Sequence, residues 1–342
     1  MTDPDVIVVG AGLAGLTCAR QIQQAGHSVL VVEKARGVGG RATTRRLSQT
    51  CVDRGLPFLS VQGEYTRQLV AALQASERLQ PWPTRAGQMT ATGSQAQSQI
   101  SGYTLTAGVS AIAKHLAHDL TVHCQYRLQS LQRQDQGWQL QPETATEPDL
   151  QASAVVLALP APQARALLAP LDPRQLPPLA HTLGVLAAVE FAPCIAMAVG
   201  YPVGSLDALP GDWLEFPDDG AIAHLSLESS KRAATEAVLV VYSTPEFANA
   251  YLDAADLQAA TAALLARLAV YLELPTAPLW TLPHRWRYAN TQRPARQPYL
   301  TASESPPLLC CGDWCLGDRA ESALASGAAA ATALLQFGQA ER

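Results

Sequence analysis

The sequence predicts an α/β fold with a largely parallel sheet, and three observations near the start of the chain predict it. The first is the all-apolar run over residues 6–9, typical of a strand covered on both faces. The second is a set of glycines at positions 10, 12 and 15, followed by a helical pattern over residues 14–25. The third is a strand-like run over residues 28–32. Strand, glycine turn, helix and strand in this order begin a βαβ unit of parallel strands.

The glycine turn has the spacing that binds the pyrophosphate of a dinucleotide. Gly10 permits a tight turn, Gly12 lets a phosphate approach the backbone, and Gly15 lets the helix pack close to the strand. The free N–H groups of the helix N-terminus then point at phosphate. Glu33 stands where a carboxylate accepts hydrogen bonds from a ribose. The predicted contacts are Gly10, Ala11, Gly12, Ala14, Gly15 and Glu33; a plain strand, turn and helix without ligand is the alternative.

A second glycine-rich turn, Arg36-Gly-Val-Gly-Gly-Arg41, follows shortly after Glu33. It resembles the RxGGR stretch of the flavin amine oxidase superfamily, in which the turn crosses over the FAD pyrophosphate and the final arginine lies near the flavin. The resemblance implies that FAD is the cofactor. The contacts implied here are Lys34, Arg36, Gly39, Gly40 and Arg41. A surface turn with a solvated arginine is the alternative for the Gly-Gly-Arg triplet.

Composition and charge narrow the classes of partner. The 342 residues are 48% apolar and exceed the usual size of one core, which predicts one large domain or two closely joined domains. The net charge of −5 argues against broad affinity for nucleic acid, because phosphate binding needs clustered basic charge. A local basic cluster does occur, and the predicted pyrophosphate is its simplest partner; its members are Arg36, Arg41, Arg45, Arg46 and Arg54.

Cysteine usage and hydropathy predict a soluble, cytoplasmic protein without a metal. The seven cysteines are an odd number and lie mostly in apolar runs, as reduced core residues do. Cys310, Cys311 and Cys315 lack the fourth ligand and the spacing of a zinc site. No apolar stretch is long enough to cross a bilayer, so we expect no membrane association. The first strand begins by Asp5, so we also expect no cleavable signal peptide.

Residues 42–47 and 51–53 predict a hairpin that turns at residues 48–50. The stretch after it, Asp53-Arg-Gly-Leu-Pro-Phe58, occupies the place where members of the superfamily bring backbone against the flavin. Renalase-like proteins have D-x-G-A-Q-Y-F there, so Asp53, Gly55 and Phe58 fit, whereas Leu56 and Pro57 depart. The resemblance implies backbone contacts to the flavin from Leu56, Pro57 and Phe58 and leaves a polar side-chain role there unassigned.

The middle of the chain alternates short helices and strands. Helices are predicted over residues 64–76 and 109–120, strands over 121–123, 125–133, 138–141 and 154–160, and short strands and loops over 87–102. By resemblance, the backbone over residues 126–128 lies against adenine, which adds Arg127 to the cofactor contacts. Strands follow at 182–191, 195–200, 221–227 and 237–243, then a helix at 254–272 and a proline-rich loop at 292–307. This α+β region is expected to roof a substrate pocket.

The last segment carries a second specific motif. Residues 308–313 predict a strand that ends in Gly-Asp, and residues 321–337 predict an alanine-rich helix. In many FAD enzymes this aspartate bonds a ribityl hydroxyl and the helix N-terminus faces the flavin N1 and C2 carbonyl. The contacts implied are Gly312, Asp313, Ser322, Ala323 and Leu324, and a turn or helix-cap role is the alternative for the aspartate. FAD is expected to be non-covalent, since Cys315 lies outside the linkage motif of monoamine oxidases.

Together these blocks resemble the renalase-like branch of the superfamily. The supporting blocks are residues 33–41 with 45–46, 284–289, 312–315 and 321–327. The implied fold is α/β, with a Rossmann-type FAD-binding domain and an inserted α+β substrate domain, like p-hydroxybenzoate hydroxylase and monoamine oxidase. The expected limits are 1–56, 104–165 and 285–342 for the FAD-binding domain, and 57–103 and 166–284 for the substrate domain.

The resemblance implies an oxidase of misreduced dihydronicotinamide isomers, 2- or 6-dihydro-NAD(P). Such an enzyme returns NAD(P)+ and passes the electrons to oxygen as hydrogen peroxide, so its partners are a small dinucleotide and oxygen. Because the substrate ring gains aromaticity, no strong general base is required. Trp286 and Tyr288, two apart on one strand, are expected to share a face and wall the pocket. His224 and His284 are candidate contacts to a carboxamide. Packing in the core is the alternative for Trp286 and Tyr288, and an ordinary core or surface position is the alternative for the two histidines.

Two other functions stay open. A true amine oxidase or desaturase of the same fold often holds a lysine near flavin N5 through a water. Lys34 belongs to the ribose end and Lys114 to a predicted helix, so Lys231 is the candidate among the three lysines. Aromatic residues for an amine cage are few, at 6% of the chain. The other alternative is a non-catalytic FAD-binding protein with a redox or scaffold role.

Overall fold

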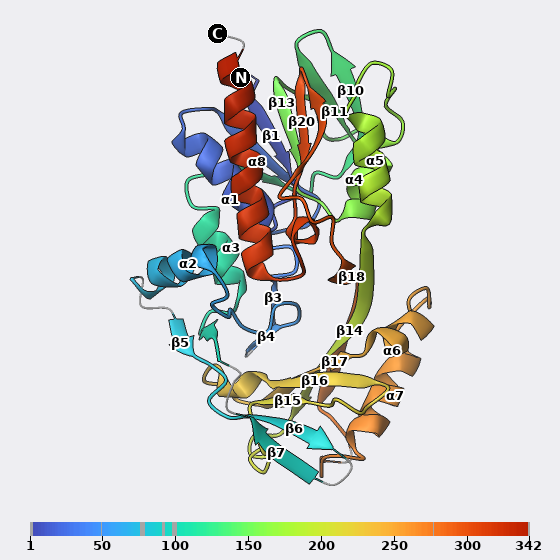
Figure 1. Cartoon of the computed structure of the whole chain (residues 1–342). Coiled ribbons are helices and arrows are strands. Elements are labelled where there is room, and N and C mark those ends of the chain that lie inside the picture. Colours follow the sequence, from blue (N-terminus) through green and yellow to red (C-terminus); the bar gives the residue numbers. More distant parts are fainter. Residues whose placement is uncertain are drawn as a thin grey trace.

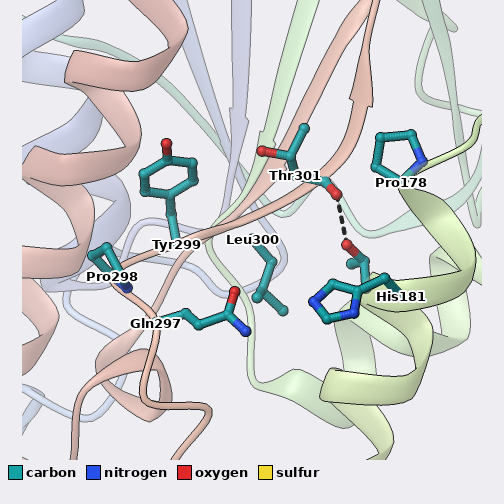
Figure 2. Close-up of a pocket in the computed structure, with 8 residues that line it drawn as sticks. Pro178, His181, Gln297, Pro298, Tyr299, Leu300 and Thr301 are labelled. Atoms are coloured by element: carbon teal, nitrogen blue, oxygen red, sulfur yellow. Dashed lines mark hydrogen bonds between the residues drawn. The ribbon is translucent and has the colours of Figure 1, made fainter.

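The structure is a computed structural model that describes residues 3–48, 50–75, 79–90, 93–97, 101–275 and 277–340. Figure 1 shows two layered parts that are joined by the long strands β14 (Glu190–Tyr201) and β18 (Trp280–Arg293). The two ends of the chain lie at the same end of one part, where the last helix packs beside the first.

The part that holds both chain ends is built on a six-stranded sheet. Its strand order is β19 (Leu300–Glu304), β20 (Pro307–Cys310), β13 (Ala154–Leu157), β1 (Val6–Val9), β2 (Val29–Glu33) and β9 (Thr121–Cys124). All neighbours are parallel except β19 with β20, and Val8 lies between Val31 and Val156. Every residue of β1 is buried, as expected for a strand covered on both faces. The predicted order of strand, glycine turn, helix and strand is confirmed.

Helices cover one face of this sheet, and a small second sheet with two helices covers the other. On the first face α1 (Leu13–Gln24), α3 (Ser110–Leu116) and α8 (Ala320–Ala340) share a core with Val6 and Val8. On the second face Ile7 and Val9 share a core with β10 (Leu128–Gln134), β11 (Gly137–Pro142), β12 (Leu150–Ala152), α4 (Ala161–Leu168) and α5 (Leu179–Ala188). Alternate residues of one strand thus supply two cores.

Glycine allows α1 to lie very close to its neighbours at two points. A Cβ on Gly15 would be 2.0 Å from the carbonyl oxygen of Gly10, and one on Gly327 of α8 would be 2.1 Å from that of Ala14. Neither distance is possible for a real side chain, so both positions require glycine. The expectation that Gly15 brings the helix against the strand is confirmed, and Gly327 does the same for the first and last helices.

The other part is built on a seven-stranded sheet. Its order is β18, β14, β17 (Ala237–Ser243), β16 (Ile222–Leu227), β15 (Trp213–Glu215), β6 (Ala86–Thr90) and β7 (Gly93–Gln97). α6 (Pro245–Ala250) and α7 (Gln258–Leu268) cover one face. The hairpin β3 (Thr44–Arg46) and β4 (Cys51–Asp53) packs on the opposite face through Val52. The N-terminal segment therefore reaches the second sheet directly after its glycine turns.

Short elements complete the connection between the two parts. They are α2 (Glu64–Gln74), β5 (Leu79–Pro81), β8 (Tyr103–Leu105) and the 3-10 helices η1 (Glu228–Ser230) and η2 (Asp313–Cys315). β5 pairs with β8 in a two-stranded ladder, and α2 packs against α8.

Two predicted elements are wrong. The predicted strand over residues 182–191 is helix α5, and the strand β14 begins after it at Glu190. Leu179, Thr182 and Leu186 are the buried residues of α5, and their spacing of three and four is helical, although the run also fits a buried strand. The predicted loop over 292–307 contains β19, which exists because it pairs with β20. The two strands form a hairpin across Ser305 and Pro306, and the four prolines of the segment favour a loop in the sequence.

The other predicted helices and strands occur at or near their predicted positions. The helices predicted over residues 109–120 and 254–272 are shorter, at Ser110–Leu116 and Gln258–Leu268. Parts of three predictions lie outside the described residues: Gln49 in the hairpin turn, Ser76 at a helix end, and residues 91–92 and 98–100 in the segment of short strands and loops. β18 runs through residue 284, where the sequence places a domain boundary, and the domain limits stay a prediction.

Candidate active site

The two glycine turns of the sequence lie against each other at the carboxyl ends of β1 and β2. The N–H of Gly39 donates to the Ala11 carbonyl at 2.8 Å, and Gly12 forms a parallel bridge with Gly39. Gly10 and Gly39 have φ angles of +107° and +122°, which other residues rarely adopt. A Cβ on Gly12 would meet nothing within 4 Å, so the space above this turn is open. α1 begins there without a side-chain cap, so its first N–H groups can bind an anion.

Glu33 ends β2 beside this turn and is 8% exposed. Its carboxylate accepts hydrogen bonds from the N–H groups of Ala11 at 2.9 Å and Ala35 at 2.8 Å. An ionised carboxylate has about four acceptor positions, so about two remain for the hydroxyls of a ribose. The predicted role of Glu33 is therefore compatible with its position.

The segment predicted to contact adenine passes next to Glu33. The N–H of Tyr126 donates to the Glu33 carbonyl at 3.0 Å. Arg127 pairs with Glu143 at 3.1 Å, and both side chains are more than half exposed. Three predicted contacts therefore lie at the exposed rim of this region: Lys34, Arg36 and Arg127.

Arg41 joins segments from both ends of the chain. Its guanidinium donates to the Asp313 carboxylate at 2.5 Å. It also donates to the carbonyl oxygens of Tyr288 at 3.2 Å and Ala289 at 3.0 Å in β18. Asp313 is 6% exposed at the start of η2. The two motifs found at opposite ends of the sequence are thus one hydrogen-bonded unit.

The first turn of α8 is held in place from two sides. Glu321 accepts hydrogen bonds from the N–H groups of Tyr65 at 3.2 Å and Thr66 at 2.7 Å, and so caps α2. The N–H of Gly312 donates to Ser326 Oγ at 3.0 Å, which ties the Gly-Asp turn to α8. This arrangement fixes the predicted flavin-facing residues Ser322, Ala323 and Leu324. Sequence reasoning missed Glu321, because its partners are about 255 residues away.

Asp53 is fully buried and anchors the stretch predicted to contact the flavin. Its carboxylate accepts hydrogen bonds from Arg232 at 2.7 Å, from the Thr44 hydroxyl at 2.6 Å and from the Val109 N–H at 3.0 Å. Its own N–H donates to Glu228 at 2.9 Å. The position that resembles the renalase-like motif therefore serves to join the hairpin, α3 and η1.

Lys231 is 0% exposed and completes a group of four buried charges, which we call the buried ion cluster (Asp53, Glu228, Lys231 and Arg232). The ammonium of Lys231 pairs with Glu228 and donates to the Pro57 carbonyl at 2.7 Å. Burial acts to lower the pKa of Arg232, but the carboxylates of Asp53 and Glu228 outweigh it and raise the pKa. Two acids and two bases leave no net charge. The sequence contained part of this signal as Glu228 with Lys231-Arg232, but the second acidic partner, Asp53, is distant in the chain.

The stretch after Asp53 divides between the two parts of the molecule. A Cβ on Gly55 would be 1.8 Å from the Arg41 carbonyl, and the N–H of Leu56 donates to that same oxygen at 2.9 Å. The ring of Phe58 packs edge-on against Trp213, with centroids 5.3 Å apart. Leu56 therefore lies on the RxGGR turn, whereas Phe58 belongs to the aromatic side chains of the seven-stranded sheet.

His224 lies in a stack of rings on the seven-stranded sheet, 4.4 Å from Trp213 and 4.5 Å from Tyr242. Burial lowers the pKa of His224 to about 3, so the ring is neutral at ordinary pH. Tyr242 donates its hydroxyl to the Asp53 carbonyl at 2.9 Å. His224 is therefore linked to the buried ion cluster through Tyr242. Its contact with substrate stays a prediction.

Trp286 and Tyr288 have different partners. Trp286 donates its indole N–H to the Arg54 carbonyl at 2.8 Å, and its ring lies 4.3 Å from His284. Tyr288 packs against Phe191 at 5.4 Å. The register of β18 against β14 shifts at this segment, which interrupts the alternation of side chains along the strand. The structure therefore brings Trp286 together with His284 and Arg54, but not with Tyr288.

Comparison with protein families shows which family has the two glycine turns and the Gly-Asp motif found here. Residues 87–335 match the family model described as flavin containing amine oxidoreductase, and residues 8–73 match that of the NAD(P)-binding Rossmann-like domain. The chain belongs to the flavin containing amine oxidoreductase family. Its cofactor is FAD, as the paired glycine turns and the Gly-Asp motif predict.

Solved structures of low sequence identity share the fold of this oxidoreductase. Cyclohexylamine oxidase from Brevibacterium oxydans IH-35A matches with a TM-score of 0.75 and 14% identity over 100% of both chains. Putrescine oxidase bound to putrescine matches with a TM-score of 0.72 and 14% identity, over 98% of this chain and 99% of that one. The predicted fold class, a Rossmann-like FAD-binding part with an amine oxidase type of architecture, is confirmed.

Curated relatives of the oxidoreductase match over short stretches. The Mycobacterium tuberculosis protein AofH is 41% identical over 80 residues, which are 23% of this chain and 17% of that protein. The L-amino-acid oxidase of Siganus canaliculatus is 51% identical over 45 residues, 13% of this chain and 8% of the fish enzyme. These alignments span less than a fifth of either relative.

The described residues contain no helix that is long and apolar enough to cross a membrane. Within the same residues, no group of three or more His, Cys, Asp or Glu side chains is placed to hold a metal ion. All seven cysteines are free, and five of them are buried, in agreement with the predicted core thiols.

Proposed function

We propose that this oxidoreductase oxidises misreduced dihydronicotinamide isomers, 2- or 6-dihydro-NAD(P), to NAD(P)+ while oxygen becomes hydrogen peroxide. The observation that carries the proposal is the position of Lys231. Its ammonium donates to the Pro57 carbonyl, pairs with Glu228, and lies 3.9 Å from the Asp53 carboxylate. Two of its three N–H donors are thus hydrogen-bonded, and the ring of Trp82 lies 4.5 Å from the same ammonium, which is 0% exposed. Lys231 is therefore held inside a buried group of charges, which disfavours the role that a lysine often has in amine oxidases, where it holds a water beside flavin N5.

The residues of this chain fit FAD. The open space over Gly12 and the first N–H groups of α1 suit a pyrophosphate. Glu33 has acceptor positions for a ribose, and Asp313 is held by Arg41 where the resemblance places a ribityl hydroxyl. Cys315 is fully buried, which supports a non-covalent cofactor.

The proposed reaction needs no acid or base catalysis by a side chain. FAD, when bound, supplies the two-electron acceptor, from which oxygen and one proton give hydrogen peroxide. The pyridine ring becomes aromatic as it loses hydride, so the protein needs no general base. Its residues must orient a flat ring and exclude water. Trp286 and His284 form a half-buried aromatic pair suited to this, because burial and then the charge of Arg54 lower the pKa of His284 to about 4 and keep it neutral.

A cytoplasmic location belongs to the same proposal. All seven cysteines are free thiols, which is the usual state in a reducing compartment. The substrate class is expected there as well, since NAD(P) is a cytoplasmic cofactor.

An amine oxidase or desaturase activity is the second candidate. The family match favours it, and the structural neighbours include proteins named cyclohexylamine oxidase and putrescine oxidase. A non-catalytic FAD-binding role is the third candidate, and the presence of a complete second sheet beside the cofactor residues argues against it.

Anaerobic bleaching of the flavin separates the three candidates. Purified holoprotein is mixed with borohydride-reduced NAD, which contains the misreduced isomers, and in parallel with a panel of primary and secondary amines. Bleaching by the isomers and not by amines supports the proposal. Bleaching by amines alone supports the second candidate, and a flavin that neither reagent reduces supports the third.

A further inference from the structure

Arg54 is a half-buried arginine whose side chain has no hydrogen bond or ion pair within the part of the chain that the structure describes. Its Nε is buried and makes no hydrogen bond, and in the described part of the chain no acidic side chain pairs with it. Burial and then the positive charge of Arg45 lower its pKa. Its immediate neighbour Asp53 cannot compensate, because that carboxylate is already bonded to Arg232.

Arg45 lies on the β3–β4 hairpin, close to Arg54. Arg45 is directly opposite Val52 in the ladder, so these two side chains lie on one side of the hairpin. Arg54 is the first residue after β4 and lies close enough to Arg45 for that charge to lower its pKa. On the side that Arg45 and Val52 share, Val52 packs against the seven-stranded sheet together with Trp286. Arg45 is exposed, and no ion pair to it occurs among the described residues. Two cations therefore stand close together at the hairpin that packs against the seven-stranded sheet.

The backbone that carries Arg54 is fixed. Its carbonyl accepts the indole N–H of Trp286 at 2.8 Å. The next residue, Gly55, lies so close to the Arg41 carbonyl that a Cβ there would be 1.8 Å from it. Arg54 is thus held between the RxGGR turn and the Trp286–His284 pair, at the border of the flavin site.

Two adjacent cations without a counter-ion are unfavourable in a folded protein, more so where one is half-buried. Guanidinium groups bind phosphate with paired hydrogen bonds, so an anionic ligand would relieve both costs. We infer that Arg54 and Arg45 form a phosphate site for the dinucleotide part of the substrate. This inference rests on the proposed function and deepens it, because it assigns substrate recognition to two named residues and makes the pocket unfavourable for a cationic amine.

The phosphates of FAD are the competing ligand. The cofactor pyrophosphate is expected over Gly12, beside Gly39. Arg54 is tied instead to Trp286 in β18, which belongs to the seven-stranded sheet. We therefore assign the arginine pair to the substrate, and the FAD content of the variants tests this choice.

The first experiment compares substrates with and without phosphate in the holoenzyme. The variants are Arg54→Gln, Arg54→Lys and Arg45→Gln, with Lys114→Gln as a control that removes one exposed cation far from the hairpin in sequence. For the dinucleotide isomers we expect KM to rise about tenfold or more in Arg54→Gln, with a smaller rise in Arg45→Gln and little change in kcat. For borohydride-reduced 1-methylnicotinamide, which has no phosphate, we expect no change.

The second experiment measures binding without turnover. Inorganic pyrophosphate is titrated into oxidised holoprotein and followed by calorimetry and by the flavin absorbance. Wild type and Lys114→Gln should bind it equally, Arg54→Gln should bind about tenfold more weakly, and raised salt should weaken binding by wild type.

The outcomes separate this inference from the proposed function. If the isomers are not oxidised but pyrophosphate binds in an Arg54-dependent way, the phosphate site stands and the proposed function falls. If the isomers are oxidised, and substitution of Arg54 and Arg45 changes neither KM nor the affinity for pyrophosphate, the phosphate site is refuted. Loss of FAD from folded Arg54→Gln or Arg54→Lys would assign the arginines to the cofactor and overturn the inference. Should Arg54→Gln fail to fold, KM, pyrophosphate affinity and FAD content are measured on Arg45→Gln and Arg54→Lys instead.

Discussion

Asp53 and Arg54 are consecutive residues, yet they belong to two opposite kinds of charged region. Asp53 is part of the buried ion cluster, in which two carboxylates face two cations at little or no exposure. Arg54 and Arg45 have like charge and have no acidic partner in the described residues, and Gly55, which follows Arg54, packs against the Arg41 carbonyl. A balanced group of charges completes its own hydrogen bonds, whereas an unbalanced one stays ready to bind an ion of opposite sign.

The same difference distinguishes a structural role for the buried ion cluster from the recognition role that we propose for Arg54 and Arg45. Lys231 is the lysine that an amine oxidase mechanism would use, but it supports the Pro57 carbonyl from within the balanced cluster. The Tyr242 hydroxyl and the ring of His224 extend that cluster into the seven-stranded sheet. Arg54, the residue after Asp53, is half-buried and leaves part of its charged side chain exposed to solvent.

Removal of one carboxylate from the balanced cluster should have the largest effect. Asp53→Ala leaves the buried Arg232 guanidinium and the Val109 N–H without their acceptor, so we expect a loss of about 3–5 kcal/mol in the free energy of unfolding. Chemical denaturation measures it. Asp253→Ala, which breaks an exposed pair with Arg287, should cost less than about 1 kcal/mol. Equal effects of the two substitutions would contradict the structural role of the cluster.

Lys231→Met tests whether this lysine is structural or catalytic. It removes the nearer of the two cations that pair with Glu228 and leaves Arg232 at 3.6 Å, so we expect a loss of about 3 kcal/mol in stability. The folded fraction should retain its kcat for dihydronicotinamide isomers, measured per bound flavin. A variant of unchanged stability whose flavin is reduced far more slowly would instead show that Lys231 takes part in the reaction.

Acid titration tests whether the ring of His224, which stacks on Tyr242, is neutral in the folded protein. His224 has a folded pKa of about 3 against an ordinary value of 6.5, so folding favours its neutral form. The stability it contributes is fully present above about pH 6.5 and is lost as the pH falls toward 3. His224→Phe should lose less stability over this window than wild type, and His118→Gln, at an exposed position, should follow wild type. Parallel curves for wild type and His224→Phe would refute this account.

The smallest effect, and one of opposite sign, is expected at the unbalanced pair. Arg54→Leu removes both the repulsion by Arg45 and a half-buried unpaired guanidinium, so stability should rise by about 0.5–1 kcal/mol at low salt. Thermal unfolding in low and high salt measures it, with Arg174→Leu, at an exposed pair, as the control. A loss of several kcal/mol would mean that Arg54 is balanced within the fold after all.

Features that depend on neighbouring residues could be predicted from the sequence. The strands Val6–Val9 and Ala237–Ser243 agree with their predicted limits, because a run of apolar residues between turn residues is itself the property of a buried strand. The two glycine turns were predicted for the same reason, since a positive φ at Gly10 or Gly39 requires glycine at that position. Family resemblance then brought Asp313 and Arg41 to one cofactor, and their contact agrees with it.

Features that depend on distant partners were missed or misplaced. α5 is helical although its apolar run also fits a strand, because β19 and the adjoining core select its buried face of Leu179, Thr182 and Leu186. The alternation expected to join Trp286 with Tyr288 is interrupted by a register shift against β14. The cap that Glu321 provides for α2 joins segments from opposite ends of the chain.

The sequence by itself determined the glycine turns, the buried strands and the flavin family of this protein, because these depend on backbone freedom and on the order of apolar residues along the chain. Tertiary structure decided that Asp53 joins the local Glu228 in balancing Lys231 and Arg232, whereas Arg54 has no acidic partner among the described residues. Whether a charge is compensated depends on which other charges lie within a few ångströms of it, and only folding determines those distances.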